Sequence, residues 1–96
     1  MGDHPYHGWY VPPVPFTAEL ADGRARFGAR LRQLRKRAAL KQEQLAERAG
    51  IDRKSISRME NAQHSPALDV IFQVARALGV EPGELFHRQD KDGFAP

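Results

Sequence analysis

Residues 41–61 read KQEQLAERAGIDRKSISRMEN, and this stretch decides the fold. It divides into two short helical patterns, residues 41–49 and 52–61, on either side of Gly50. Glycine takes a left-handed conformation without a steric cost, which suits a helix end followed by a turn. Two helices and a tight turn with glycine are the ingredients of a helix-turn-helix. The apolar residues recur at helical spacing in both halves: Leu45, Ala46, Ala49, Ile56 and Met59.

The second half of the stretch carries hydrogen-bond donors on its polar side. Asp52 stands before it and suits the N-cap of a helix. Such donors suit phosphates and the acceptor edge of guanine, although a solvated helix surface has a similar composition. The donors are Arg53, Lys54, Ser55, Ser57 and Arg58.

Charge is distributed unevenly along the 96 residues, although the net charge is only +3. Residues 24–58 hold 12 Lys and Arg against three acids, which gives +9, whereas residues 1–23 and 59–96 each sum to −3. A basic block between acidic ends indicates a local face for a polyanion. The helix-turn-helix pattern within the block favours this interpretation over a solvated surface.

Composition argues against several functional classes. The chain has no cysteine, which excludes a disulfide scaffold, a thiolate zinc site and a cysteine nucleophile. Ser55 and Ser57 have no suggestively placed histidine, because His64 falls in a loop and His87 in the tail. We therefore expect no enzyme, no cofactor and no metal site. No apolar run approaches the ~20 residues of a membrane span, and no secretory signal is visible, so a cytoplasmic protein without membrane contact is expected.

Further helical patterns flank the stretch and predict an all-α domain of five helices over residues 23–87, with a tail at 88–96. The first helix starts at Ala18 or Arg24, because Gly23 and Gly28 weaken its first part, and it ends at Ala38. Leu40 points back to the core. The fourth starts at Ser65 or just after it, and a short fifth follows Gly79. The apolar stripes are Phe27, Leu31, Leu34, Ala38 and Leu68, Ile71, Ala75, Leu78, the latter widened by Phe72 and Val74; Leu85 and Phe86 close over the core. The other faces of the first helix carry Arg24, Arg26, Arg30, Arg32, Lys36 and Arg37.

Residues 1–22 are predicted to form an extended N-terminal arm. Four prolines forbid a regular helix there and favour polyproline II backbone, and the absence of Lys and Arg argues against an arm that grasps DNA. Three alternatives remain open: a disordered arm, an arm docked in an apolar groove of its own domain or of a dimer partner, and a separate site for a protein partner. The arm is rich in large apolar residues: Tyr6, Trp9, Tyr10, Val11, Val14 and Phe16.

Residues 27–86 resemble the phage repressor/Cro-type (Xre) helix-turn-helix family, most specifically in QEQLAERAGI, ISRMEN and SPALDVIFQVARALGV. The resemblance implies a five-helix domain that docks its third helix in the major groove of double-stranded DNA, as a homodimer joined near residues 79–82, on a two-fold operator. The base-reading positions match Arg53, Lys54, Ser57 and Arg58. The phosphate-contacting positions match Lys41, Gln42, Ser55, Asn61 and Gln63.

The resemblance also implies internal contacts and exposes two departures. Gln42 should brace a side chain of the third helix, and Arg35 and Glu60 match a buried ion pair, the alternative being two independent surface charges. Lys41 stands where Ser or Thr commonly caps the second helix. Ala62 replaces a usual glycine, so that turn must avoid positive φ or bear strain.

The expected function is sequence-specific regulation of transcription, such as repression, by occupation of promoter DNA. The alternative is a helix-turn-helix antitoxin or adaptor whose N-terminal arm binds a protein partner. A structural interaction domain without a DNA role is the third hypothesis, which the basic block disfavours.

Overall fold

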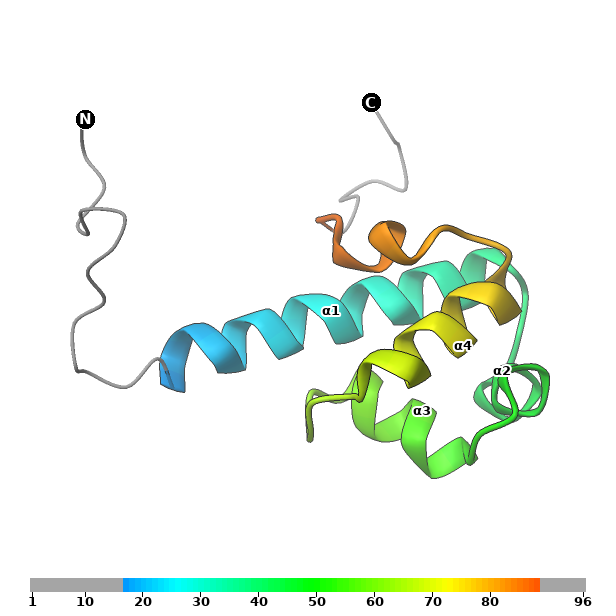
Figure 1. Cartoon of the computed structure of the whole chain (residues 1–96), viewed down its shortest axis with the longest axis horizontal. Helices are drawn as coiled ribbons and strands as arrows, with labels where there is room; N and C mark the ends of the chain where they lie inside the picture. Colours follow the sequence, from blue (N-terminus) through cyan, green and yellow to red (C-terminus); the bar gives the residue numbers. More distant parts are fainter. Residues whose placement is uncertain (1–16, 89–96) are drawn as a thin grey trace.

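The computed structural model describes residues 17–88, which form four α-helices and one 3-10 helix (Figure 1). The elements are α1 (Thr17–Arg37), α2 (Gln42–Ala49), α3 (Arg53–Glu60), α4 (Leu68–Leu78) and the 3-10 helix η1 (Pro82–Phe86). α1 packs against α3 and η1, α2 packs against α3 and α4, and α4 packs against η1. The predicted all-helical class is therefore confirmed for these residues, whereas the fifth predicted helix is a single short 3-10 element.

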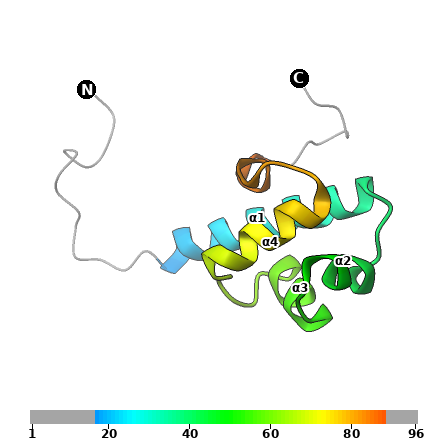
Figure 2. The same ribbon diagram turned by 45° about the vertical axis from the view of Figure 1, so that its right-hand side comes forward.

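α1 starts earlier than the predicted arm allows. It begins at Thr17, so residues 17–22 belong to the helix and not to an extended segment. Pro15 is the last proline before it, and Glu19 in the first turn is favourable at the positive end of the helix dipole. These first turns are exposed and project beyond the other helices (Figures 1 and 2). The remainder of the predicted arm, residues 1–16, and most of the tail lie outside the described residues.

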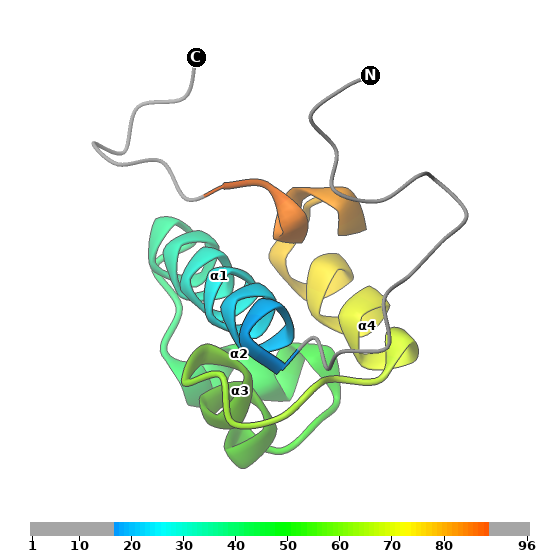
Figure 3. The same cartoon turned by 90° about the vertical axis from the view of Figure 1, so that its left-hand side faces the viewer.

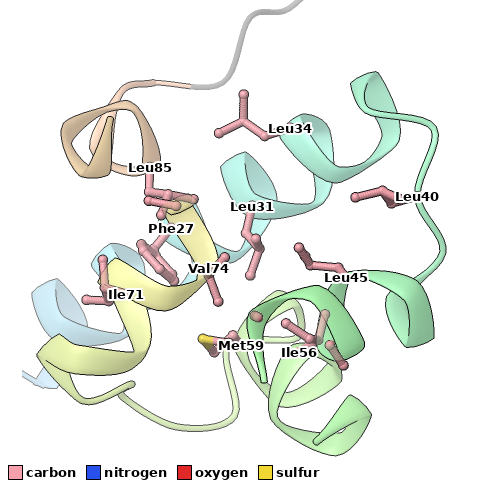
Figure 4. Close-up of a cluster of buried hydrophobic side chains, with 13 residues drawn as sticks. Phe27, Leu31, Leu34, Leu40, Leu45, Ile56, Met59, Ile71, Val74 and Leu85 are labelled. Atoms are coloured by element: carbon pink, nitrogen blue, oxygen red, sulfur yellow. The ribbon is translucent and has the colours of Figure 1, made fainter. Parts of the chain in front are cut away.

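One apolar core lies between the helices (Figure 4). Five of its side chains, from four helices and η1, have no exposed surface: Leu31, Leu45, Ile56, Val74 and Leu85. Ala38, Leu68, Phe72 and Phe86 were also predicted to face this core, and all four are exposed. Ala38 lies past the end of α1, in the turn at residues 38–39.

The start of α4 accounts for the error at Leu68. The helix begins at Leu68 with Ala67 as its N-cap, so Ser65 and Pro66 belong to the preceding loop and not to the first turn. A helical side chain leans toward the N-terminus of its helix, and at the first position this places it beyond the packed turns. Leu68 is consequently 63% exposed.

All four α-helices end with the same pair of backbone hydrogen bonds. At each end the N–H of the residue that follows the left-handed residue donates to the carbonyl five residues earlier, as from Gln63 to Arg58 over 2.8 Å and from Leu40 to Arg35 over 3.1 Å. This arrangement is the Schellman motif, which needs one left-handed residue. Gly50 and Gly79 supply it after α2 and α4. Alanine supplies it after α1 and α3.

Ala62 therefore bears strain, the second of the two outcomes predicted for its turn. Its φ is 58°, as is that of Ala39 after α1. A left-handed conformation costs an L-residue with a Cβ atom about 1–2 kcal/mol. The hydrogen bond that closes each turn and the packing of the next segment offset that cost.

Gly28 lets the backbones of α1 and α3 come into direct contact. A Cβ atom added to Gly28 would lie 2.8 Å from the Glu60 carbonyl oxygen and closer still to that of Met59. Every other amino acid would force the two helices apart. This glycine, which the sequence suggested only as a weak point of the helix, therefore sets the distance between α1 and α3.

Arg30 fastens η1 to α1. Its side chain was predicted to lie on a polar face, but the residue is only 4% exposed. Its Nε donates to the Glu84 carbonyl oxygen over 2.9 Å, and its Nη2 donates to Glu84 Oε1 over 3.0 Å. Arg30 lies three residues after Phe27 and four before Leu34, so it shares their side of the helix.

Candidate nucleic-acid interface

The helix-turn-helix predicted from residues 41–61 is formed by α2 and α3, which pack side by side (Figure 2). α2 ends at Ala49, the following Gly50 turns the chain with a φ of 73°, and α3 begins three residues after Gly50. Asp52 occupies the predicted N-cap position with extended backbone, but its side chain makes no capping hydrogen bond. Its carbonyl oxygen instead accepts the N–H of Ser55 over 3.0 Å.

α3 turns one side to the core and the other to solvent. It buries Ile56, Met59 and Glu60. Arg53, Lys54 and Arg58 are exposed on the outer side, while Ser55 and Ser57 are partly buried. An eight-residue helix with this division can present its polar side to a ligand without disturbing its packing.

The cations on the outer side of α3 are available to a partner. Within residues 17–88, the charged groups of Arg53, Lys54 and Arg58 form no ion pair and no hydrogen bond. No Asp or Glu side chain in that part of the chain neutralises them. They therefore give α3 a positive surface that a polyanion can approach.

Glu60, the last residue of α3, receives donors from α1 and α2. Arg35 Nε donates to Glu60 Oε2 over 2.6 Å, and Arg35 Nη2 donates to Oε1 over 3.0 Å. Gln42 Nε2 adds a hydrogen bond of 3.0 Å to Oε1. The Glu60 side chain has no exposed surface and that of Arg35 is 11% exposed. The contact that the family resemblance implied for Arg35 and Glu60 is present, so these are not two independent surface charges.

These donors keep Glu60 ionised. Burial raises the pKa of the Glu60 carboxyl, but the hydrogen bonds from Arg35 and Gln42, the positive charge of Arg35 and a hydrogen bond from Arg32 lower it by more. The pKa therefore lies below its ordinary value. The ionised carboxylate holds the end of α3 against α1 and the start of α2 at neutral pH.

The start of α2 presents two of the residues matched to phosphate contacts. Lys41 is exposed, and Gln42 is partly buried with its amide on Glu60. Lys41 cannot cap the helix with an acceptor of its own, and Gln44 compensates in part, because its Oε1 accepts the Lys41 N–H over 2.8 Å. The Gln42 amide keeps a second N–H, since one amide nitrogen carries two donors.

Asn61 and Gln63, which follow the last residue of α3, differ in how their side chains are used. Asn61 caps the helix: its Nδ2 donates to the Ser57 carbonyl oxygen over 2.9 Å, and its Oδ1 accepts from Arg32 Nη2 over 3.4 Å. Its side chain is thus largely committed within the protein. Gln63 is exposed, and only its backbone N–H is used, in the turn after α3.

Arg32 belongs to this site although the sequence did not single it out. Its Nε lies 3.4 Å from Glu60 Oε1, and its side chain is 45% exposed beside the end of α3. A signal was available, because Arg32 and Arg35 are three residues apart and share one side of a helix. Arg32 partly balances its charge against Glu60 and keeps a solvent-facing surface.

The described part of the chain holds neither a cluster of metal ligands nor a membrane-spanning helix. Residues 17–88 contain no group of three His, Asp or Glu side chains that could hold a metal ion. No helix in that range is long and apolar enough to cross a bilayer. The site is a positively charged helix surface on a rigid support.

Comparisons with known proteins agree with this geometry. A family described as a helix-turn-helix domain matches residues 26–88. A protein of Methanothermobacter thermautotrophicus named as an HTH-type transcriptional regulator is 43% identical over 63 residues, which are 66% of this chain and 91% of that protein. The match thus covers nearly the whole of that relative.

Solved structures resemble the chain over the same region. The restriction-modification controller protein C.AhdI from Aeromonas hydrophila is 42% identical, with a TM-score of 0.65 over 72% of this chain and 98% of that one. A hypothetical transcription factor from Neisseria is 31% identical, with a TM-score of 0.67 over 81% of this chain and 86% of its own.

Proposed function

Since the chain belongs to the helix-turn-helix family of transcriptional regulators, we propose that it inserts α3 into the major groove of double-stranded DNA and reads a specific sequence there. The observation that carries the proposal is the contrast between two sets of cations. Arg35 and Arg32 are engaged by Glu60, whereas Arg53, Lys54 and Arg58 are exposed on α3 without a partner in residues 17–88.

Arg53 and Arg58 are the proposed readers of bases. An arginine bidentate to O6 and N7 of guanine is the commonest specific contact in the major groove and contributes about 1–3 kcal/mol of discrimination. Lys54 and Ser57 lie on the same exposed side or at its edge and supply further donors. The proposal assigns Arg53 and Arg58 to sequence preference first, because of their bidentate geometry.

Phosphate contacts come from the start of α2 and from the turn after α3. Lys41 and the second N–H of Gln42 stand at the first turn of α2, where backbone N–H groups also favour an anion. Ser55 and Gln63 add donors next to α3. Asn61 contributes less to phosphate binding than the family match implies, since its amide caps α3.

The protein acts as a homodimer on a two-fold operator in this proposal. Support comes from the resemblance to repressor/Cro-type regulators, which implies paired subunits. Two copies of α3 would then enter successive major grooves about 34–36 Å apart. Selection from a random DNA library should recover two inverted half-sites with that spacing, while a single asymmetric site would contradict the dimer.

The readers are tested by repeating the selection with variants. Arg53→Ala and Arg58→Ala should each relax preference at one or two positions per half-site, by about 1–3 kcal/mol per position. Arg76→Ala, an exposed cation on α4, is the matched control and should leave the motif unchanged. An unchanged motif for both α3 variants would reject this assignment of the readers.

Salt dependence separates phosphate contacts from base reading. Lys41→Ala should weaken binding to all sequences alike and reduce the slope of log K against log salt concentration by about one unit. Lys54→Ala should do the same if its ammonium lies on a phosphate. The Arg76→Ala slope serves as the reference, and a Lys41→Ala slope equal to it would remove Lys41 from the contact set.

A further inference from the structure

An apolar groove of about 360 Å³ opens between the first half of α1, the loop before α4 and η1. Figure 3 looks toward the start of α1, with α4 and η1 beside it. Its apolar lining consists of Leu20, Phe27, Pro66, Ile71, Leu85 and Phe86. This groove takes no part in the DNA-binding site proposed for α2 and α3.

The floor of the groove is apolar, and its edge carries large apolar side chains beside the charged side chains of Glu19, Arg24 and Arg26. Phe27, Ile71 and Leu85 are buried beneath it, and the Phe27 and Phe86 rings pack with centroids 5.4 Å apart. Leu20 and Phe86 are 57% and 61% exposed. Large exposed apolar side chains around a hollow mark a surface that another segment covers.

We propose that this groove binds the aromatic N-terminal segment of the same chain, residues 1–16. That segment leads directly into α1 at Thr17, and the first two turns of α1 carry Leu20 and Gly23 on the groove side. A Cβ atom built on Gly23 meets nothing within 4 Å, so the groove is open at that point. Residues 1–16 are therefore covalently joined to one edge of the groove, the start of α1.

The composition of the segment matches the lining. Residues 1–16 carry, besides Met1, six large apolar or aromatic side chains and neither Lys nor Arg. Their single charged side chain is Asp3, while the groove edge carries Arg24 and Arg26. Prolines at 5, 12, 13 and 15 favour the extended polyproline II form, which aromatic grooves bind without a large loss of entropy.

The length of the segment is sufficient. α1 rises about 1.5 Å per residue, so Leu20 and Phe27 are about 10 Å apart along it. Polyproline II backbone rises about 3.1 Å per residue, and four residues cover that span. Sixteen residues leave about twelve to turn back along α1. Because the segment is tethered, its effective concentration at the groove is of millimolar order, which favours its own groove over that of a second copy.

Trp9 provides the test, because it is the single tryptophan of the chain. In the folded 96-residue chain, Trp9 emission should be shifted to shorter wavelength, and its acrylamide quenching constant should be several-fold lower than in the urea-unfolded chain. Leu20→Asp and Phe86→Asp should each raise that constant toward the unfolded value. Phe72→Asp, at a half-exposed phenylalanine outside the groove lining, is the matched control and should not.

Each other outcome overturns the proposal. Phe86 touches Phe27, so its variant is judged only if circular dichroism shows native helicity, and Leu20, on the projecting turns, gives the second reading. Quenching of the native protein equal to that of the unfolded chain would show that the segment does not dock. If Trp9 stays protected from acrylamide in both groove variants, it is buried at a place other than this groove. Protection that disappears on dilution, together with dissociation of a dimer, would assign the groove to a second copy.

Discussion

Replacing Gly28 by alanine should destabilise the protein, although the same change inside most helices is stabilising. The substitution adds one methyl group at the point where α1 meets the backbone of α3. Alanine in a helix interior is favoured over glycine by about 1 kcal/mol. The sign of the result therefore measures whether contact between the two backbones or helix propensity dominates at this site.

The close approach of the α3 backbone predicts that the change in stability is a loss. The new Cβ atom would lie 2.8 Å from the Glu60 carbonyl oxygen, whereas ordinary contacts begin at 3.4 Å, so the atoms must separate by at least 0.6 Å. The required separation from Met59 is greater, and both obstacles are backbone atoms that cannot rotate away. Overpacking of this kind costs about 1–3 kcal/mol. Moving α3 away from α1 also lengthens the Arg35–Glu60 hydrogen bonds, and losing a bond to a charged group costs about 1.5–3 kcal/mol.

The net loss should be about 1.5–5 kcal/mol after the gain in helix propensity is subtracted. For a domain of this size each kcal/mol shifts the melting temperature by about 4–8 °C. Gly23→Ala is the matched control, since the same helix offers its new methyl group open space. That variant should melt a few degrees above the wild type.

The assay is thermal and urea unfolding of both variants, monitored by circular dichroism at one protein concentration. We expect Gly23→Ala to rise and Gly28→Ala to fall. A Gly28→Ala protein as stable as Gly23→Ala would refute the reasoning, because it would mean that α1 and α3 can separate at no cost. The Arg35–Glu60 pair would then not hold them at their observed distance.

Three further predictions concern charge and helix ends. Glu60→Gln should lower stability by about 3 kcal/mol at neutral pH. Because the folded-state pKa of Glu60 is depressed, the stability that its carboxylate contributes is complete above its unfolded pKa of about 4.3 and is lost as pH falls through the lower folded value. The difference in melting temperature from wild type should therefore hold from about pH 7 to 5 and shrink below about pH 4. A difference independent of pH would contradict this role. Ala62→Gly should stabilise the protein by up to about 1 kcal/mol, since relief of the left-handed strain exceeds the added entropy of the unfolded chain. Ala25→Gly, at an exposed position inside α1, should instead destabilise it by about 1 kcal/mol. Urea unfolding measures both, and equal signs would be inconsistent with strain at Ala62. Arg30→Met should lower stability by about 1–3 kcal/mol, because it breaks the contacts with Glu84. Arg26→Met, which breaks an exposed pair with Asp22 at 3.9 Å, should cost under about 0.5 kcal/mol. Similar melting temperatures for the two variants would show that Arg30 does not fasten η1 to α1.

The parts of the fold predicted well from the sequence are those with a local cause. Helix ends at Gly50 and Gly79 follow from the left-handed turn that each supplies. The apolar spacing of Leu45, Ile56 and Met59 placed the helix-turn-helix, and the resemblance to repressor/Cro-type regulators is confirmed by the family match. Such features depend on a few neighbouring residues, so the sequence reveals them directly.

The errors arise where a distant segment decides. Gly28 looked like a weak position in a helix, and only the approach of α3 shows why glycine is required. Arg30 looked like a surface cation until Glu84, fifty-four residues later, was found beside it. The sequence left the start of α1 open between Ala18 and Arg24, and the arm was drawn too long, because the prolines and aromatics before Thr17 suggested one extended segment.

The position of Glu60 has a consequence for how the protein opens. An isolated helix of eight residues is not stable in water, so α3 depends on its tertiary contacts. Its last residue is held by side chains from both α1 and α2, so the end of α3 cannot detach unless both of these contacts break. The backbone amides in the second half of α3 should therefore exchange with deuterium only through global unfolding, while those in the exposed first turns of α1 exchange through local fraying. A helix at the surface of the molecule would thus rank among its slowest-exchanging segments.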